Sequence, residues 1–189
     1  MSEFINTIDA LGDDAVIDGI LNGTITEFCD DTINKIGQNA LFGCTKLLTI
    51  DIPNVTSLGA SSLNKSGTST TKLHIPKVTS YGWGAISNAY FGEIKLEGIG
   101  NINASVIQSC SKLKSLILSR TDKIISLVGT SQLSGTPIAS GTGYIYVPSS
   151  LVATYQTATN WSTYAAQFRA LEDYTVDGTI TGELDESKI

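Results

Sequence analysis

The chain has 189 residues, of which 41% are hydrophobic and 16% are charged, and its net charge is −6. This length suits one domain, and the hydrophobic content excludes a largely disordered chain. The negative charge and the lack of a Lys/Arg-rich stretch argue against nucleic acid as a partner, because phosphates require a basic surface.

Residues 1–24 do not repeat and are predicted to form an N-terminal cap. Two aspartates, Asp13 and Asp14, precede a largely apolar run at 15–21 that ends before Gly23, which predicts a short helix with an acidic first turn. The aspartates at 9, 13, 14 and 18 lack the spacing of an EF-hand loop, so a cap is favoured over a metal site.

Residues 25–148 repeat one unit. Ile36-Gly37 returns as Leu58-Gly59, Tyr81-Gly82, Ile102-Asn103 and, more loosely, Leu127-Val128, in steps of 22, 23, 21 and about 25 residues. Self-similarity at such a period indicates a solenoid, in which each coil buries its apolar side against its neighbours.

Each repeat contains a short segment that reads apolar, variable, apolar. This alternation predicts a strand with its first and third residues inward, and stacked coils would pair these strands in parallel. The predicted inward residues are Ile50, Ile52, Leu73, Ile75, Ile94, Leu96, Leu116, Leu118, Ile145 and Val147. A second inward set, on the other side of each coil, is Val55, Val78, Ile99 and Ile124, followed by Leu58, Tyr81, Ile102 and Leu127.

The first full repeat carries a recognisable pattern in Ile36, Gly37, Ala40, Leu41, Cys44 and Leu47, followed by Ile50-Asp51-Ile52-Pro53. It resembles the BspA-type leucine-rich repeat of bacterial surface proteins and phage structural proteins. The resemblance implies a leucine-rich-repeat solenoid, mostly β, of about five irregular coils with a parallel strand ladder and a cap at each end.

Residues 65–72 form a small polar insertion, Ser66-Gly67-Thr68-Ser69-Thr70-Thr71. Insertions in solenoids map to loops on one face, often the binding face, although a plain flexible loop fits this segment equally well.

Residues 149–172 are predicted to form a helical C-terminal cap. One helix follows Pro148, and a second begins near Ser162 with Tyr164, Ala165, Phe168 and Leu171 on one stripe. In residues 173–189, Asp177-Gly178 predicts a hairpin before an acidic tail. The hairpin either folds back on its own domain or acts as an assembly arm on another copy of the chain.

The outward positions of the predicted strands bring Asp51, His74, Lys95 and Tyr146 into one row, together with Ile117. The row is a candidate ligand-contacting surface, since a strand ladder is the flattest continuous surface of a solenoid. The alternative is an ordinary solvated face. Catalysis by His74 beside Asp51 is not favoured, because no nucleophile is fixed nearby.

Trp83 falls at a variable, outward position of the third coil, with Tyr90 and Phe91 close by in sequence. Large aromatic side chains in such places bind a sugar or a protein partner. Alternatively, Trp83 packs under the 65–72 loop or at a subunit contact.

The three cysteines, Cys29, Cys44 and Cys110, lack the spacing of a zinc site or redox motif. Cys44 and Cys110 occupy the same repeat position and are predicted to be small buried side chains rather than a disulfide. No motif indicates a metal or another cofactor, and no enzyme site emerges.

The resemblance predicts a non-catalytic structural and recognition protein of a bacteriophage virion, in the tail or on the capsid surface. Its expected partners are other virion proteins and a host cell-surface glycan or protein, with homo-oligomerisation through residues 173–189 as a further option. No secretory signal is visible after Met1, which favours the virion over the alternative, a bacterial cell-surface interaction module.

Overall fold

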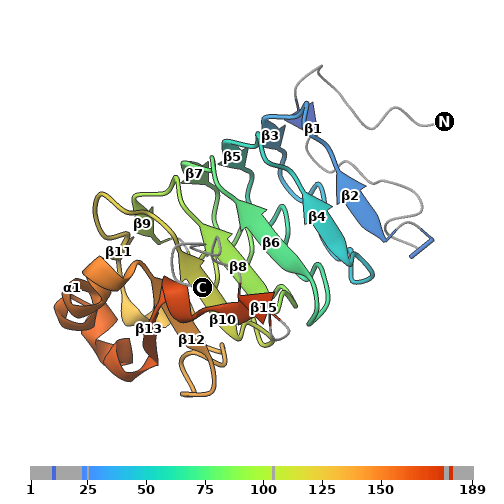
Figure 1. Ribbon diagram of the computed structural model, residues 1–189. Helices are drawn as coiled ribbons and strands as arrows, with labels where there is room; N and C mark the ends of the chain where they lie inside the picture. The colour runs from blue at the N-terminus through green and yellow to red at the C-terminus, as the bar shows by residue number, and fades with distance from the viewer. Residues whose placement is uncertain (1–9, 12–22, 25, 104, 177–178, 181–189) are drawn as a thin grey trace.

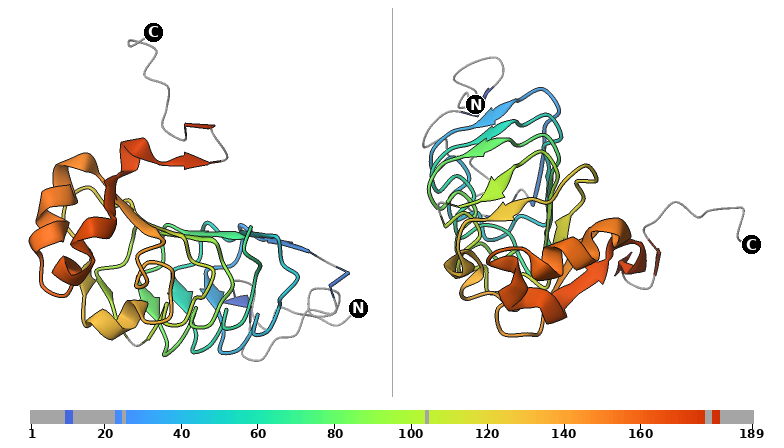
Figure 2. Two further views of the ribbon diagram at one scale, coloured as in Figure 1. Left: turned by 90° about the horizontal axis from the view of Figure 1, so that it is seen from below. Right: turned by 90° about the vertical axis from the view of Figure 1, so that its left-hand side faces the viewer.

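The computed structural model describes residues 10–11, 23–24, 26–103, 105–176 and 179–180. These residues form a stack of coils, with short strands along one side, longer strands along the opposite side and helices at the C-terminal end (Figures 1 and 2). The helix predicted at 15–21 and the four aspartates considered as a metal site lie outside the described residues.

The longer strands form one seven-stranded parallel sheet in the order β13-β12-β10-β8-β6-β4-β2. Its strands are β2 (Glu27–Cys29), β4 (Thr49–Asp51), β6 (Lys72–Ile75), β8 (Glu93–Leu96), β10 (Ser115–Leu118), β12 (Tyr144–Val147) and β13 (Phe168–Ala170). The five predicted strands are therefore confirmed as a parallel ladder, and β2 and β13 add one strand at each edge.

The shorter strands form two separate sheets on the opposite side. The first has the order β1-β3-β5-β7 and the second pairs β11 with β9. Their bounds are β1 (Ala10–Leu11), β3 (Lys35–Ile36), β5 (Ser57–Leu58), β7 (Ser80–Tyr81), β9 (Asn101–Ile102) and β11 (Ser126–Leu127). No ladder joins β7 to β9, so this side of the stack opens between the third and fourth coils.

The core fills the space between the two sides. All ten residues predicted inward on the longer strands are buried. On the other side Val55, Val78, Ile99, Leu58, Ile102 and Leu127 are buried as predicted. Two predictions on this side are wrong: Tyr81 is only partly buried, and Ile124 is only partly buried while Ile125 is buried in its place. The C-terminal cap binds both peptide groups of Ile125, and this holds that residue on the inside.

Two repeat glycines set the spacing of the first coils. A Cβ at Gly59 would lie 2.4 Å from the backbone nitrogen of Gln38, and a Cβ at Gly82 would lie 2.4 Å from that of Ala60. Only glycine permits this approach of one backbone to the next. The fourth coil has Asn103 at this position, and its Cβ cannot fit at the same spacing. The exchange of glycine for Asn103 thus coincides with the opening between β7 and β9.

The C-terminal cap is only partly helical. The 3-10 turn η2 (Ser149–Leu151) leads into α1 (Val152–Thr157) as predicted, and η3 (Trp161–Gln167) follows. The prediction that the second helix continues through Phe168 and Leu171 is wrong: Phe168 starts β13, which pairs with β12, and Leu171 starts η4 (Leu171–Asp173). With η1 (Thr130–Leu133), these are the helices of the described residues, and none is long and apolar enough to cross a membrane.

Side chains of the cap take the place of a further strand beside β11. The hydroxyl of Tyr155 accepts a hydrogen bond from Ile125 N–H at 2.8 Å, and Trp161 Nε1 donates to the Ile125 carbonyl at 2.7 Å. Asn160 Nδ2 donates to the Leu127 carbonyl at 2.8 Å. The peptide N–H and carbonyl groups of Ile125 and the carbonyl of Leu127 point away from β9. The cap therefore supplies hydrogen-bond partners for backbone groups that the last coil would otherwise leave unpaired.

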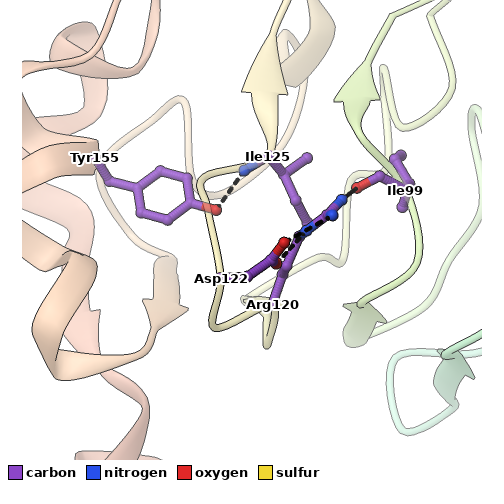
Figure 3. A network of polar contacts seen from close by, with 5 residues as sticks. All are labelled: Ile99, Arg120, Asp122, Ile125 and Tyr155. Atoms are coloured by element: carbon purple, nitrogen blue, oxygen red, sulfur yellow. Dashed lines mark hydrogen bonds and ion pairs between the residues drawn. The ribbon is translucent and has the colours of Figure 1, made fainter.

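A surface ion pair borders this junction. Figure 3 shows Tyr155 reaching Ile125, with Arg120 and Asp122 on the adjoining turn. Arg120 Nε lies 2.6 Å from Asp122 Oδ1, and Arg120 Nη1 donates to the Ile99 carbonyl at 3.4 Å. Arg120 thus ties the turn before β11 to the preceding coil.

The predicted hairpin is present. β14 (Thr175–Val176) pairs antiparallel with β15 (Thr179–Ile180), with Val176 opposite Thr179. Two residues separate the paired positions, as expected for Asp177-Gly178.

Of the three cysteines, only Cys29 is exposed, and the burial predicted for Cys44 and Cys110 is confirmed. Burial raises the pKa of the Cys44 thiol to about 11 and that of the Cys110 thiol to about 12. Thiolates are the reactive form. We therefore expect Ellman's reagent to modify one thiol per native chain rapidly and all three after denaturation; fast native modification of a Cys29→Ser variant would contradict this placement.

Candidate recognition surface

The outward row of the seven-stranded sheet is in register across the coils. Asp51 pairs with His74, His74 with Lys95, Lys95 with Ile117, and Ile117 with Tyr146. Asp51 and His74 are exposed and Lys95 and Tyr146 are partly exposed. The structure thus brings four of the predicted site residues together on one surface, which we call the ladder face.

A second outward row lies beside the first, and it includes Lys72, Glu93 and Ser115. Lys72 Nζ lies 3.5 Å from Glu93 Oε2. Sequence reasoning missed this pair, although a signal was available: each residue immediately precedes an inward apolar residue of the predicted strands, so the alternation places both outward on neighbouring coils.

The segment between β13 and β14 crosses the ladder face. Figure 2 shows the segment after β13 lying over the outer side of the seven-stranded sheet. We call residues 171–174 the strap. Tyr174 is only 8% exposed, its hydroxyl donates a hydrogen bond to the Glu93 carboxylate, and its ring meets that of Tyr146 edge-on at 4.6 Å. Glu172 accepts a hydrogen bond from the Ser149 hydroxyl at 3.1 Å, which fixes the start of the strap.

The strap leaves an open cavity on each side of Tyr174. One has a volume of about 370 Å³ and is lined by Lys72, His74, Glu93, Lys95, Ile117, Leu171 and Tyr174. The other measures about 280 Å³ and is lined by residues 69–72 of the polar insertion together with Gly92, Glu93, Lys114, Ser115, Tyr146 and Tyr174. Ile117 lies under the strap and is buried, so the apolar centre of the row is covered.

The electrostatics of this surface follow from partial burial. Burial, with the Glu93 carboxylate beside it, raises the pKa of Tyr174, so its hydroxyl stays protonated and keeps its role as donor. Partial desolvation, followed by the charge of Lys95, lowers the pKa of His74 below its usual range. His74 is therefore mostly neutral at pH 7, and lysines supply the positive charge of the first cavity.

The polar insertion is held by its own hydrogen bonds. Thr71 is buried, and its hydroxyl donates to the Leu47 carbonyl of the preceding coil at 2.6 Å. The same hydroxyl accepts from Thr68 N–H at 2.8 Å. The insertion is thus a fixed wall of the second cavity, which favours the binding-face interpretation over that of a plain flexible loop.

The aromatic candidates do not form one group. Trp83 is 67% exposed, as predicted, but it follows β7 on the side of the stack opposite the ladder face. The prediction that Phe91 contributes to a binding surface is wrong. Phe91 is fully buried, and its ring packs closely against Gly67 as part of the core. Tyr90 is half-buried, and among the described residues no ring contact joins it to Trp83.

The ladder face offers charged groups, hydroxyls and aromatic rings for recognition. In the part of the chain that the structure describes, no group of three or more His, Cys, Asp or Glu side chains could hold a metal ion. His74 and Asp51 are neighbours in register, but the row contains no serine or cysteine between them that could act as a nucleophile.

Comparison with known proteins bears on the repeat region. Residues 23–129 match the model for the BspA type leucine-rich repeat region, in six copies. This is one copy more than the sequence pattern indicates, and the match begins just before β2, one of the two strands of the longer sheet that the pattern did not predict. Neither the curated proteins nor the solved structures gave a match. Leucine-rich repeats generally form non-catalytic modules for protein binding. The match spans more than half of the chain, which therefore belongs to the BspA-type leucine-rich repeat family.

Proposed function

We propose that this protein is a non-catalytic recognition component of a bacteriophage particle, in the tail or on the capsid surface, and that its ladder face binds a protein or glycan of the host cell surface. The proposal rests on one observation above all: Asp51, His74 and Lys95 stand in register on neighbouring strands, and the same row continues through Ile117 to Tyr146, beside two cavities that the strap borders.

A rigid surface of this kind suits recognition. Side chains that project from a fixed ladder lose little further freedom on binding, so more of the contact energy appears as affinity. The two cavities provide concave surface beside the row. Tyr146 and Tyr174 lie nearby, and tyrosine is one of the residue types that contribute most of the binding energy in interfaces. The virion setting is supported by the resemblance of the repeats to those of phage structural proteins.

Binding to cells tests the role of the ladder face. We expect the double variant Asp51→Ala, Lys95→Ala to bind bacterial cells about tenfold more weakly than the wild type, a loss of roughly 1.4 kcal/mol. Its unfolding midpoint should be unchanged, because exposed charges contribute little to stability. The measurement is flow cytometry of fluorescently labelled protein on a panel of bacterial strains.

A charge-matched control is available away from the row. Asp31 and Lys35 are both exposed, and the variant Asp31→Ala, Lys35→Ala also removes one charge of each sign. It should bind as the wild type does. Equal loss in both variants, or no loss in either, would remove the ladder face from the recognition role, and a lack of binding to any strain would overturn recognition of the cell surface.

The setting has its own test. Antibody against this chain should label the tail or capsid surface of phage particles in electron micrographs. Label confined to bacterial envelopes would overturn the virion setting and assign the protein to the cell surface.

A further inference from the structure

The opening between β7 and β9 is held apart by one side chain. Tyr81 stands where the neighbouring repeats have Ile36, Leu58 and Ile102. Its hydroxyl donates to the Asn101 carbonyl and accepts from Asn103 N–H at 3.1 Å. The tyrosine thus occupies the hydrogen-bonding positions that a paired strand would use, and it keeps the two strand edges from closing on each other.

The opening forms an open hollow of about 180 Å³ on this side of the stack. It is lined by Thr79, Ser80, Tyr81, Gly100, Asn101 and Asn103. Every lining side chain is uncharged, and all but the glycine carry a hydroxyl or an amide. Hydroxyls and amides both donate and accept hydrogen bonds, so the hollow matches a ligand that presents neutral hydroxyl groups.

An exposed tryptophan follows the hollow closely in sequence. Trp83 is two residues beyond Tyr81, so their Cα atoms are at most about 7 Å apart. At 67% it is the most exposed large hydrophobic side chain among the described residues. A flat apolar ring beside hydroxyl and amide groups offers one surface for the C–H face of a sugar and another for its hydroxyls.

We propose that the Tyr81 hollow and Trp83 form a binding site for one ring of a neutral saccharide, separate from the ladder face. A volume of about 180 Å³ is well below the range of about 300 to 1,000 Å³ usual for drug-sized ligands, so a single ring fits rather than a larger molecule. The absence of charge in the lining favours neutral hexoses and N-acetylhexosamines over uronic or sialic acids.

Titration of the pure full-length protein with saccharides tests this site. The probes are oligomers of glucose, galactose, mannose and N-acetylglucosamine, with glucuronic acid and sialyllactose as charged counterparts. We expect at least one neutral probe to shift the indole N–H resonance of Trp83 in a saturable way, with no shift of the buried Trp161. The same titration should give at least tenfold weaker binding for Trp83→Ala by saturation-transfer NMR and a clear loss for Asn103→Ala.

The control variant is Phe42→Ala, which removes another exposed aromatic ring. It should leave saccharide binding intact. No saturable shift with any neutral probe, equal binding by the charged probes, or unchanged binding in Trp83→Ala would each overturn the proposal. Self-association that is abolished in Trp83→Ala, without any saccharide effect, would instead assign Trp83 to a subunit contact. None of these results depends on the ladder-face variants.

Discussion

Replacing Gly59 with alanine is expected to cost about 3 kcal/mol or more of unfolding free energy, at or above the upper end of ordinary overpacking. The new methyl group would lie 2.4 Å from Gln38 N and 2.5 Å from the Gly37 carbonyl carbon. Both contacts are backbone, so no side chain can turn away. The coils would have to separate, which would stretch the hydrogen bond of 2.7 Å from Gly59 N–H to the Ile36 carbonyl. Equilibrium denaturation with urea measures the effect.

The chain offers a matched control for this substitution. A Cβ at Gly100 would meet nothing within 4 Å, and Gly100 does not have a positive φ angle. Gly100→Ala should therefore change the unfolding free energy by no more than about 0.5 kcal/mol. Similar losses in the two variants would show that close approach of the coils does not explain the repeat glycine.

The fold was predictable because the repeat pattern is local and recurs. The alternation in Leu73-His74-Ile75 fixes a strand and its inward face without any knowledge of distant residues. β2 was not predicted because Glu27-Phe28-Cys29 lacks the apolar, variable, apolar pattern and has only a partly buried Phe28 between two exposed residues. β13 escaped because Phe168 continues the apolar spacing of the preceding helix, and its pairing with β12 is a tertiary preference that no local pattern carries.

The outward row of the ladder face could be predicted from the sequence, but the strap that crosses it could not. Register follows from the repeat, so the row of Asp51, His74 and Lys95 could be placed in advance. The contact between Tyr174 and Glu93 joins residues that are 81 positions apart, and Tyr174 lies beyond the repeats. The repeat spacing therefore cannot predict this contact. The opening at Tyr81 was only partly predictable. The sequence shows that Asn103 replaces the repeat glycine, but the effect on strand pairing depends on the distance between the backbones of neighbouring coils.

Truncation of Trp161 to alanine is expected to lower the unfolding free energy by about 3 to 5 kcal/mol, the usual cost for a fully buried tryptophan. The indole packs edge-on against Tyr155 and Phe168, at 5.7 Å between ring centroids in both cases. It also supplies the donor to the Ile125 carbonyl, at the edge that no further strand covers. Loss of the ring therefore both leaves a cavity and reopens that edge. Urea denaturation gives the magnitude, and hydrogen exchange at Ile125 N–H reports the site.

Two milder variants help to separate the contribution of ring packing from that of the hydrogen bond to the Ile125 carbonyl. Trp161→Phe keeps an aromatic ring but removes the donor and part of the indole volume, so its cost should be about 1 to 3 kcal/mol, below that of Trp161→Ala. Tyr164→Phe removes a less buried donor, to the Thr130 carbonyl, and should cost about 0.5 to 1.5 kcal/mol. If the cap substitutes for a missing strand, faster exchange at Ile125 should follow Trp161→Phe and not Tyr164→Phe. Uniform loss of protection along all coils would contradict a local role for the cap, because the last coil would then be no more dependent on Trp161 than the first.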